Sequence, residues 1–128
     1  MQLKISKEDK QQIYAQWLRQ SVSHSVVEEE FYEYAWKVAK EAAQLLKGRY
    51  GVTRVRAFGS LVHKERLHPG SDVDLAVEGL KLDDYWEAVT SVLFLDDRIP
   101  VEIVDQATCR PEIWEVVERE GVDLLRVE

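Results

Sequence analysis

The spacing of apolar residues in the first half of the chain predicts two amphipathic helices. The first is predicted to begin at Ser6 and to have Ile13 and Trp17 on its apolar face. The second follows Ser25, with apolar side chains at steps of three and four residues: Val27, Phe31, Tyr34, Val38, Ala42 and Leu45. We expect Ser25 to cap this long helix and Gly48 to end it.

The second half of the chain alternates short apolar runs with further helical patterns. Strands are predicted at residues 52–58, 72–77 and 101–104, with a final edge strand at 122–127. A helix is predicted at residues 82–93, with the apolar face Leu82, Trp86, Val89 and Leu93. A last helix should run from Pro111 to Gly121, with the face Ile113, Val116 and Val117.

This order predicts an α/β (α+β) fold, with a small mixed sheet flanked by helices and two helices added at the N-terminus. We expect one domain over residues 1–128, in which N-terminal helices (1–50) precede an α/β core (51–128). The chain has 45% hydrophobic and 32% charged residues, which is typical of a globular protein. Its length allows a modest core.

Composition also narrows the class of function. No apolar run approaches the roughly 20 residues that span a bilayer, and the N-terminus lacks a signal-peptide pattern, so we expect a cytoplasmic protein without a membrane partner. The single cysteine, Cys109, excludes an internal disulfide and fits a reducing compartment. A net charge of −7 argues against direct nucleic-acid binding and leaves room for a basic protein partner.

Two acids in one strand are the strongest chemical signal. Asp72 and Asp74 share one face of the predicted strand, while Val73 points to the other. Neighbouring carboxylates repel each other unless a cation lies between them, and Mg²⁺ is usually held by one or two carboxylates together with substrate phosphates. The pair therefore predicts a metal site. A capped turn after Gly70 and Ser71 is the structural alternative.

A phosphate site is predicted just before these acids. Gly59 lets a phosphate approach the main chain, and the N–H groups and hydroxyl at Ser60 can bind an anion. Lys64 and Arg66 are cationic candidates for phosphate contact in the loop that follows, and Ser71 is a further candidate for nucleotide binding.

Three other charged residues lie within predicted strands, and the strand pattern predicts their surroundings. Arg54 and Arg56 share one face of the first strand, which we expect to be solvated. Glu102 lies among apolar neighbours, so it either faces water or meets a partner, because an unpaired buried charge is costly.

Together these motifs resemble the nucleotidyltransferases of the DNA polymerase β superfamily, and in particular the minimal nucleotidyltransferase (MNT) group. The matching residues are Gly59-Ser60, then Asp72 and Asp74, then Glu102 on a later strand, within residues 52–125. The eleven residues between the two motifs are one more than the commonest spacing. Glu102 replaces the usual Asp, and His63-Lys64 stands where the family often has an arginine.

The resemblance implies transfer of AMP, or another nucleoside monophosphate, from ATP or another triphosphate to a hydroxyl. Asp72 and Asp74 would hold two Mg²⁺ ions, and Glu102 would complete the site and can take the acceptor's proton. Gly59 and Ser60 would hold the β- and γ-phosphates. The implied partner is a HEPN-type toxin, of which a tyrosine is modified, so that the protein acts as an antitoxin in a homo- or hetero-oligomer.

Two other functions stay open at this point. The chain could be a non-catalytic antitoxin that neutralises its partner by contact and keeps a vestigial site, or a structural α/β domain. The sequence leaves the nucleotide, the acceptor and the oligomeric state undetermined.

Overall fold

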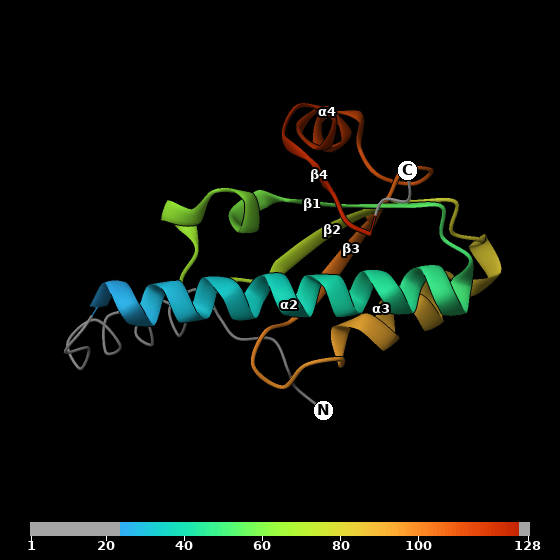
Figure 1. The fold of residues 1–128 in the computed structure, drawn as a ribbon. Helices are drawn as coiled ribbons and strands as arrows, with labels where there is room; N and C mark the ends of the chain where they lie inside the picture. Colours follow the sequence, from blue (N-terminus) through green and yellow to red (C-terminus); the bar gives the residue numbers. More distant parts are fainter. Residues whose placement is uncertain (1–23, 126–128) are drawn as a thin grey trace.

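The structure is a computed structural model that describes residues 24–125, with side chains described from Glu29 onward. Its elements, in chain order, are α2 (His24–Tyr50), β1 (Arg54–Phe58), the 3-10 turns η1 (Gly59–Val62) and η2 (Lys64–Arg66), β2 (Val73–Glu78), η3 (Leu82–Asp84), α3 (Tyr85–Leu93), β3 (Val101–Asp105), α4 (Pro111–Glu120) and β4 (Val122–Asp123) (Figure 1). The helix expected from Ser6 lies outside the described residues, as does the end of the last predicted strand.

A mixed four-stranded sheet forms the centre of the fold, as predicted. The strand order is β3-β2-β1-β4. β1 is antiparallel to both β2 and β4, whereas β2 and β3 are parallel. A parallel pair needs a crossover connection, which α3 provides between β2 and β3. Within residues 24–125, no helix is long and apolar enough to cross a membrane.

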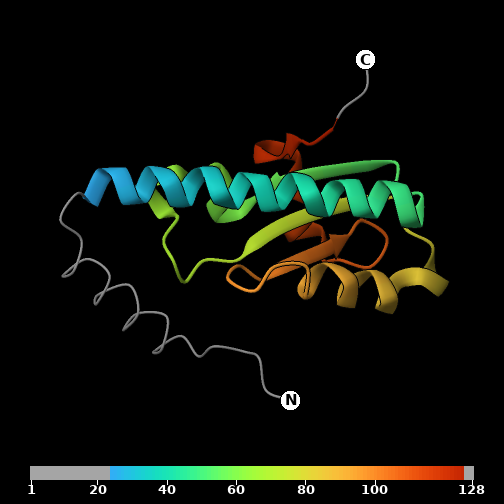
Figure 2. The same ribbon diagram turned by 60° about the horizontal axis from the view of Figure 1, so that its bottom comes forward.

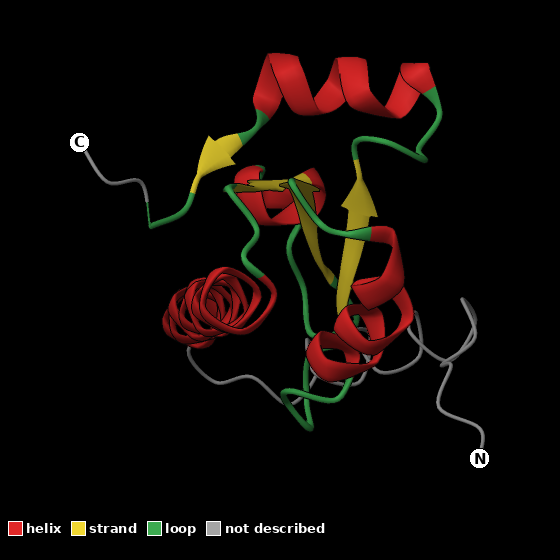
Figure 3. Ribbon diagram, turned by 90° about the vertical axis from the view of Figure 1, so that its right-hand side faces the viewer, coloured by secondary structure: helices red, strands yellow, loops and turns green. Residues whose placement is uncertain are grey.

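Helices cover both faces of the sheet. α2 and α3 lie side by side on one face (Figure 2), and α4 lies across the other (Figure 3). The main core is on the α2 side, where alternate residues of β1 and β2 meet alanines and a leucine of α2: Val55, Ala57, Val73, Leu75, Val77, Ala35, Ala39, Ala42 and Leu46. These residues are at most marginally exposed, and the alanines let α2 approach the sheet closely.

A second, smaller cluster holds α4 on the opposite face. It contains Phe58 of β1, Ala76 of β2 and Val117 of α4, with Val104 and Trp114 packed against it. The sheet residues alternate with those of the main core, as the two-residue period of a strand requires. α4 therefore occupies the same sheet face toward which Phe58 and Ala76 point.

The ends of α2 differ from the prediction. Ser25 lies inside the helix rather than before it, and the helix continues through Gly48 to Tyr50. Gly51 follows in a left-handed conformation (φ 67°), and the Val52 N–H donates to the Leu46 carbonyl at 3.3 Å. A helix tolerates an interior glycine at a cost of about 1 kcal/mol, whereas the left-handed residue after it strongly favours glycine.

The apolar face predicted for α3 is also wrong. Leu82 and Trp86 are 79% and 75% exposed, while Ala88 and Val92 are buried. The α-helix begins only at Tyr85, after the η3 turn, so a helical period counted from Leu82 selects the wrong stripe.

For α4 the predicted bounds are confirmed, and the predicted face is only partly so. Val117 is buried and Val116 packs against the α4-side cluster, but Ile113 is 38% exposed and Trp114 packs in its place.

Candidate active site

Two of the predicted acids lie side by side on neighbouring strands. Asp74 is the second residue of β2 and Glu102 the second of β3, and the two are directly opposite in the parallel register. Opposed residues of paired strands project to the same face, so both carboxylates lie on one face of the sheet. Asp72 precedes β2 by one residue and is partly buried like Asp74, whereas Glu102 is exposed.

The predicted phosphate-binding turn begins next to Asp74. Phe58, the last residue of β1, pairs with Asp74, and Gly59 follows with φ 74°. A Cβ built on Gly59 would lie only 2.7 Å from Oδ2 of Asp74. The main chain of Gly59 is therefore packed directly on this carboxylate, and Ser60 is the next residue of η1. The structure thus brings the Gly-Ser turn, Asp74 and Glu102 together.

Two of the other predicted nucleotide-binding residues, Lys64 and Ser71, have side-chain partners within the protein. Lys64 Nζ lies 2.8 Å from Oε1 of Glu29 on α2 and 4.8 Å from the ring centroid of Tyr32. Ser71 is buried, and its Oγ accepts a hydrogen bond from the N–H of His68 at 3.1 Å. Their part in nucleotide binding stays a prediction, as does that of the exposed Arg66.

The residue types fit Mg²⁺, although the structure does not form a closed metal cage. Among the residues it describes, no three His, Cys, Asp or Glu side chains gather closely enough to hold a metal ion. Mg²⁺ is commonly bound by one or two carboxylates and completed by substrate phosphates, so a pre-formed group of three is not required. Such an open site could form at Asp74 and Glu102. Gly59, which has no side chain, leaves the main chain next to Asp74 accessible.

Sequence reasoning missed the role of Arg56. This side chain is only 4% exposed, so the expectation of a solvated face is wrong for it and correct only for Arg54, whose side chain is 45% exposed. Arg56 lies 2.8 Å from Glu78 Oε2 and 2.7 Å from Glu118 Oε1. Its guanidinium is 5.3 Å from the ring centroid of Trp114. Arg56 is buried because α4 covers it.

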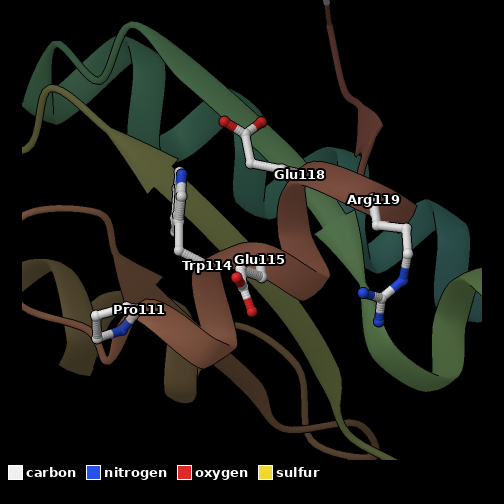
Figure 4. A pocket seen from close by; sticks show the side chains of 5 residues that line it. All are labelled: Pro111, Trp114, Glu115, Glu118 and Arg119. Carbon is white, nitrogen blue, oxygen red and sulfur yellow. The ribbon is translucent and has the colours of Figure 1, made fainter.

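The contact with Arg56 also favours the ionised form of Glu118 on α4. The hydrogen bond and the positive charge of Arg56 lower the pKa of Glu118. Trp114 and Glu118 project from the same side of α4, with Glu115 and Arg119 on the other (Figure 4). A shallow depression on this helix is lined by Pro111, Trp114, Glu115, Glu118 and Arg119, and contains none of the predicted site residues.

Comparison with known proteins decides the family. A family model described as a nucleotidyltransferase domain matches residues 37–123, more than half of the chain. The chain belongs to this nucleotidyltransferase family. The matched segment contains the Gly-Ser turn, both aspartates and Glu102. No curated protein matches the nucleotidyltransferase in a sequence search.

Solved structures agree with this assignment. A chain solved as a candidate minimal nucleotidyltransferase is 33% identical, with a TM-score of 0.55, and the match covers 70% of this nucleotidyltransferase and 92% of that chain. A toxin–antitoxin complex crystallised with AMP-PNP matches at 22% identity and a TM-score of 0.56, over 71% of this chain and 74% of that one.

A third match is also a solved toxin–antitoxin complex. It is a complex of a tri-AMPylated HEPN toxin from Shewanella oneidensis with an MNT antitoxin, at 20% identity and a TM-score of 0.55, covering 73% of each chain. At the identity of the two toxin–antitoxin complexes, the likeness concerns the fold. The predicted resemblance to the MNT group is confirmed.

Proposed function

We propose that this nucleotidyltransferase transfers AMP, or another nucleoside monophosphate, from a nucleoside triphosphate to a protein hydroxyl. The observation that supports it most is the meeting of the Gly59 turn with Asp74, next to Glu102 on β3. A phosphate-binding turn and metal-binding carboxylates must be adjacent in this reaction, because the carboxylates would hold a metal ion that neutralises the charge of the phosphates bound at the turn.

Each residue has a distinct part in the proposed reaction. The N–H groups and hydroxyl at Ser60 bind the β- and γ-phosphates and leave the α-phosphorus open to attack. The acceptor oxygen forms a bond to the α-phosphorus, the bond from the α-phosphorus to the bridging oxygen breaks, and pyrophosphate leaves. Asp72, Asp74 and Glu102 are the ligands for Mg²⁺. When bound there, Mg²⁺ neutralises phosphate charge and lowers the pKa of the acceptor hydroxyl. Glu102 is exposed, so it can reach the acceptor and take its proton.

We place the acceptor on a HEPN-type toxin, with a tyrosine as the modified residue and neutralisation of the toxin as the result. Support comes from the solved relative whose HEPN toxin is tri-AMPylated. The net charge of −7 is compatible with a basic partner. The function would be carried out in the cytoplasm.

A contact-only antitoxin is the second candidate. Two loop side chains that could bind phosphate are instead held by carboxylates, since Lys64 pairs with Glu29 and His63 with Glu120. If these pairs persist when nucleotide is present, the site binds triphosphate weakly and the partner is neutralised by the complex alone.

The two candidates are separated by one reaction. The nucleotidyltransferase is incubated with its HEPN-type partner, Mg²⁺ and each nucleoside triphosphate, and the partner is analysed by intact mass. We expect an adduct of one nucleoside monophosphate, which the double variant Asp72→Asn/Asp74→Asn fails to form.

The matched control removes two exposed aspartates elsewhere, Asp83→Asn/Asp97→Asn, and should react normally. A complex that forms with every triphosphate present, yet carries no adduct, would establish the contact-only antitoxin.

A further inference from the structure

The turn after β1 is tied to α4 through a histidine. Nε2 of His63 lies 2.8 Å from Oε1 of Glu120, the last residue of α4. The two residues are 57 positions apart in the chain, and the side chains of both are 26% exposed. The contact lowers the pKa of Glu120, chiefly through the hydrogen bond with His63. A partly sheltered, charge-assisted contact of this kind is stronger than one in open solvent.

The turn itself transmits the position of His63 to Ser60. The His63 N–H donates to the Ser60 carbonyl at 3.1 Å, which closes η1. The Arg66 N–H in turn donates to the His63 carbonyl at 2.8 Å, which starts η2. His63 therefore connects η1 and η2. A displacement of its main chain is passed to Ser60 through the hydrogen bond between them.

The other end of the tether is firmly attached to the sheet. Arg56 pairs with Glu118, two residues before Glu120, and also with Glu78 on β2. The helix end lies close to β1, because a Cβ on Gly121 would be 3.1 Å from Cδ of Arg56. Glu120 therefore holds His63 from a helix whose own position is fixed by a buried cation.

From these contacts we propose that Glu120 is a positioning residue, which holds the phosphate-binding turn in place by its bond to His63. The inference rests on the proposed function, because the turn has this role only if it binds the triphosphate. His63 contacts Glu120 at 2.8 Å, so the turn of this chain is positioned by an α4 carboxylate. Three other charged groups surround the contact: Glu65, Arg66 and Arg119.

Loss of the Glu120–His63 hydrogen bond should weaken Mg-ATP binding, whereas loss of the negative charge of Glu120 should strengthen it. Two substitutions of Glu120 separate these effects. Glu120→Ala loses both, whereas Glu120→Gln loses the charge but keeps an oxygen that accepts a hydrogen bond. If Glu120 positions the turn, Glu120→Ala binds Mg-ATP about tenfold more weakly, which corresponds to about 1.4 kcal/mol. Glu120→Gln should stay within about twofold of the wild type. Nucleotide transfer at saturating ATP should change little in either variant.

The control is Glu115→Ala, an equal loss of charge at an exposed position of the same helix. It should bind Mg-ATP as the wild type does. A double-mutant cycle with His63→Ala adds an independent measure, since the effects of Glu120→Ala and His63→Ala should be strongly non-additive. The imidazole resonances of His63 at a fixed pH should shift in Glu120→Ala while those of His68 remain, which tests the contact without nucleotide.

Three results would overturn the inference. Glu120→Ala could bind Mg-ATP as tightly as the wild type or more tightly, in which case Glu120 only repels phosphate. The two Glu120 variants could weaken binding equally, in which case the hydrogen bond that Gln can keep does not position the turn. The His63 resonances could be unchanged in Glu120→Ala, so that the contact is absent in solution. A wild type that binds no triphosphate at all would instead refute the proposed function itself.

Discussion

The contact between Gly59 and Asp74 predicts a specific effect of adding one methyl group. In Gly59→Ala the new Cβ would lie 2.7 Å from Oδ2 of Asp74, and ordinary contact begins at 3.4 Å. The carboxylate must therefore retreat by about 0.7 Å. An alanine at φ 74° also carries the strain of the left-handed region. The substitution should thus affect both stability and the proposed metal ligand.

The two effects have different sizes. Left-handed strain costs an L-residue about 1–2 kcal/mol, which we expect as the loss in free energy of unfolding. The carboxylate is the end of a side chain and can rotate away, so the clash adds little to that loss. Its displacement matters for chemistry, where a misplacement of about 1 Å can cost about 100-fold in rate. We expect nucleotide transfer to fall by about 10- to 100-fold.

Gly51→Ala is the matched control. Gly51 has nearly the same conformation, with φ 67°, but a Cβ there would meet no atom within 4 Å. Both variants should lose similar stability in urea unfolding, and only Gly59→Ala should lose transfer and Mg-dependent ATP binding. Equal activity of the two variants would show that the Gly59 turn does not shape the site.

Three further predictions concern the fold around the site. Arg56→Met should lower the free energy of unfolding by about 2 kcal/mol, because it removes two charge-assisted hydrogen bonds and a cation–π contact under α4; urea unfolding measures this. Val92→Ala should cost about 2 kcal/mol, whereas Trp86→Ala, at a 75% exposed side chain, should cost less than about 0.5 kcal/mol in the same assay. Burial alone would raise the pKa of Asp96, but the Tyr34 hydroxyl and two main-chain N–H groups outweigh it and lower that pKa. The stability from these bonds is therefore present above the unfolded pKa of about 3.9 and lost as the pH falls further, so the acid-induced loss in a melting series should be smaller in Asp96→Asn.

The proximity of the Gly-Ser turn, Asp74 and Glu102 could be predicted because it depends on local patterns and on the order of the elements. Two acids separated by one residue share a face in an extended segment; the structure confirms the strand at Asp74, whereas β2 begins at Val73, directly after Asp72. A glycine directly after a strand predicts a turn, and the structure places that turn beside Asp74. The register that sets Glu102 opposite Asp74 depends on a crossover through α3, which the order of elements already indicated.

What could not be predicted depends on contacts between distant elements. Alternation assigns Arg54 and Arg56 to one face, but it does not show that α4 covers only the second of them. Lys64 meets Glu29 and His63 meets Glu120 across 35 and 57 residues, and no local pattern contains such pairs. These contacts decide which loop cations face solvent, so the phosphate-binding set is the part of the prediction that sequence reasoning supports least.

The carboxylates near the Gly-Ser turn distinguish the catalytic function from the contact-only one. Asp72 and Asp74 are partly buried and Glu102 lies opposite Asp74, and carboxylates grouped in this way offer the oxygen ligands that suit Mg²⁺. A protein that acts by contact alone needs no such arrangement, whereas a nucleotidyltransferase does. Mg-ATP should therefore raise the melting temperature by mass action, and ATP with EDTA should not. The double variant Asp72→Asn/Asp74→Asn should lose the metal-dependent shift. An undiminished shift in that variant would place the nucleotide elsewhere.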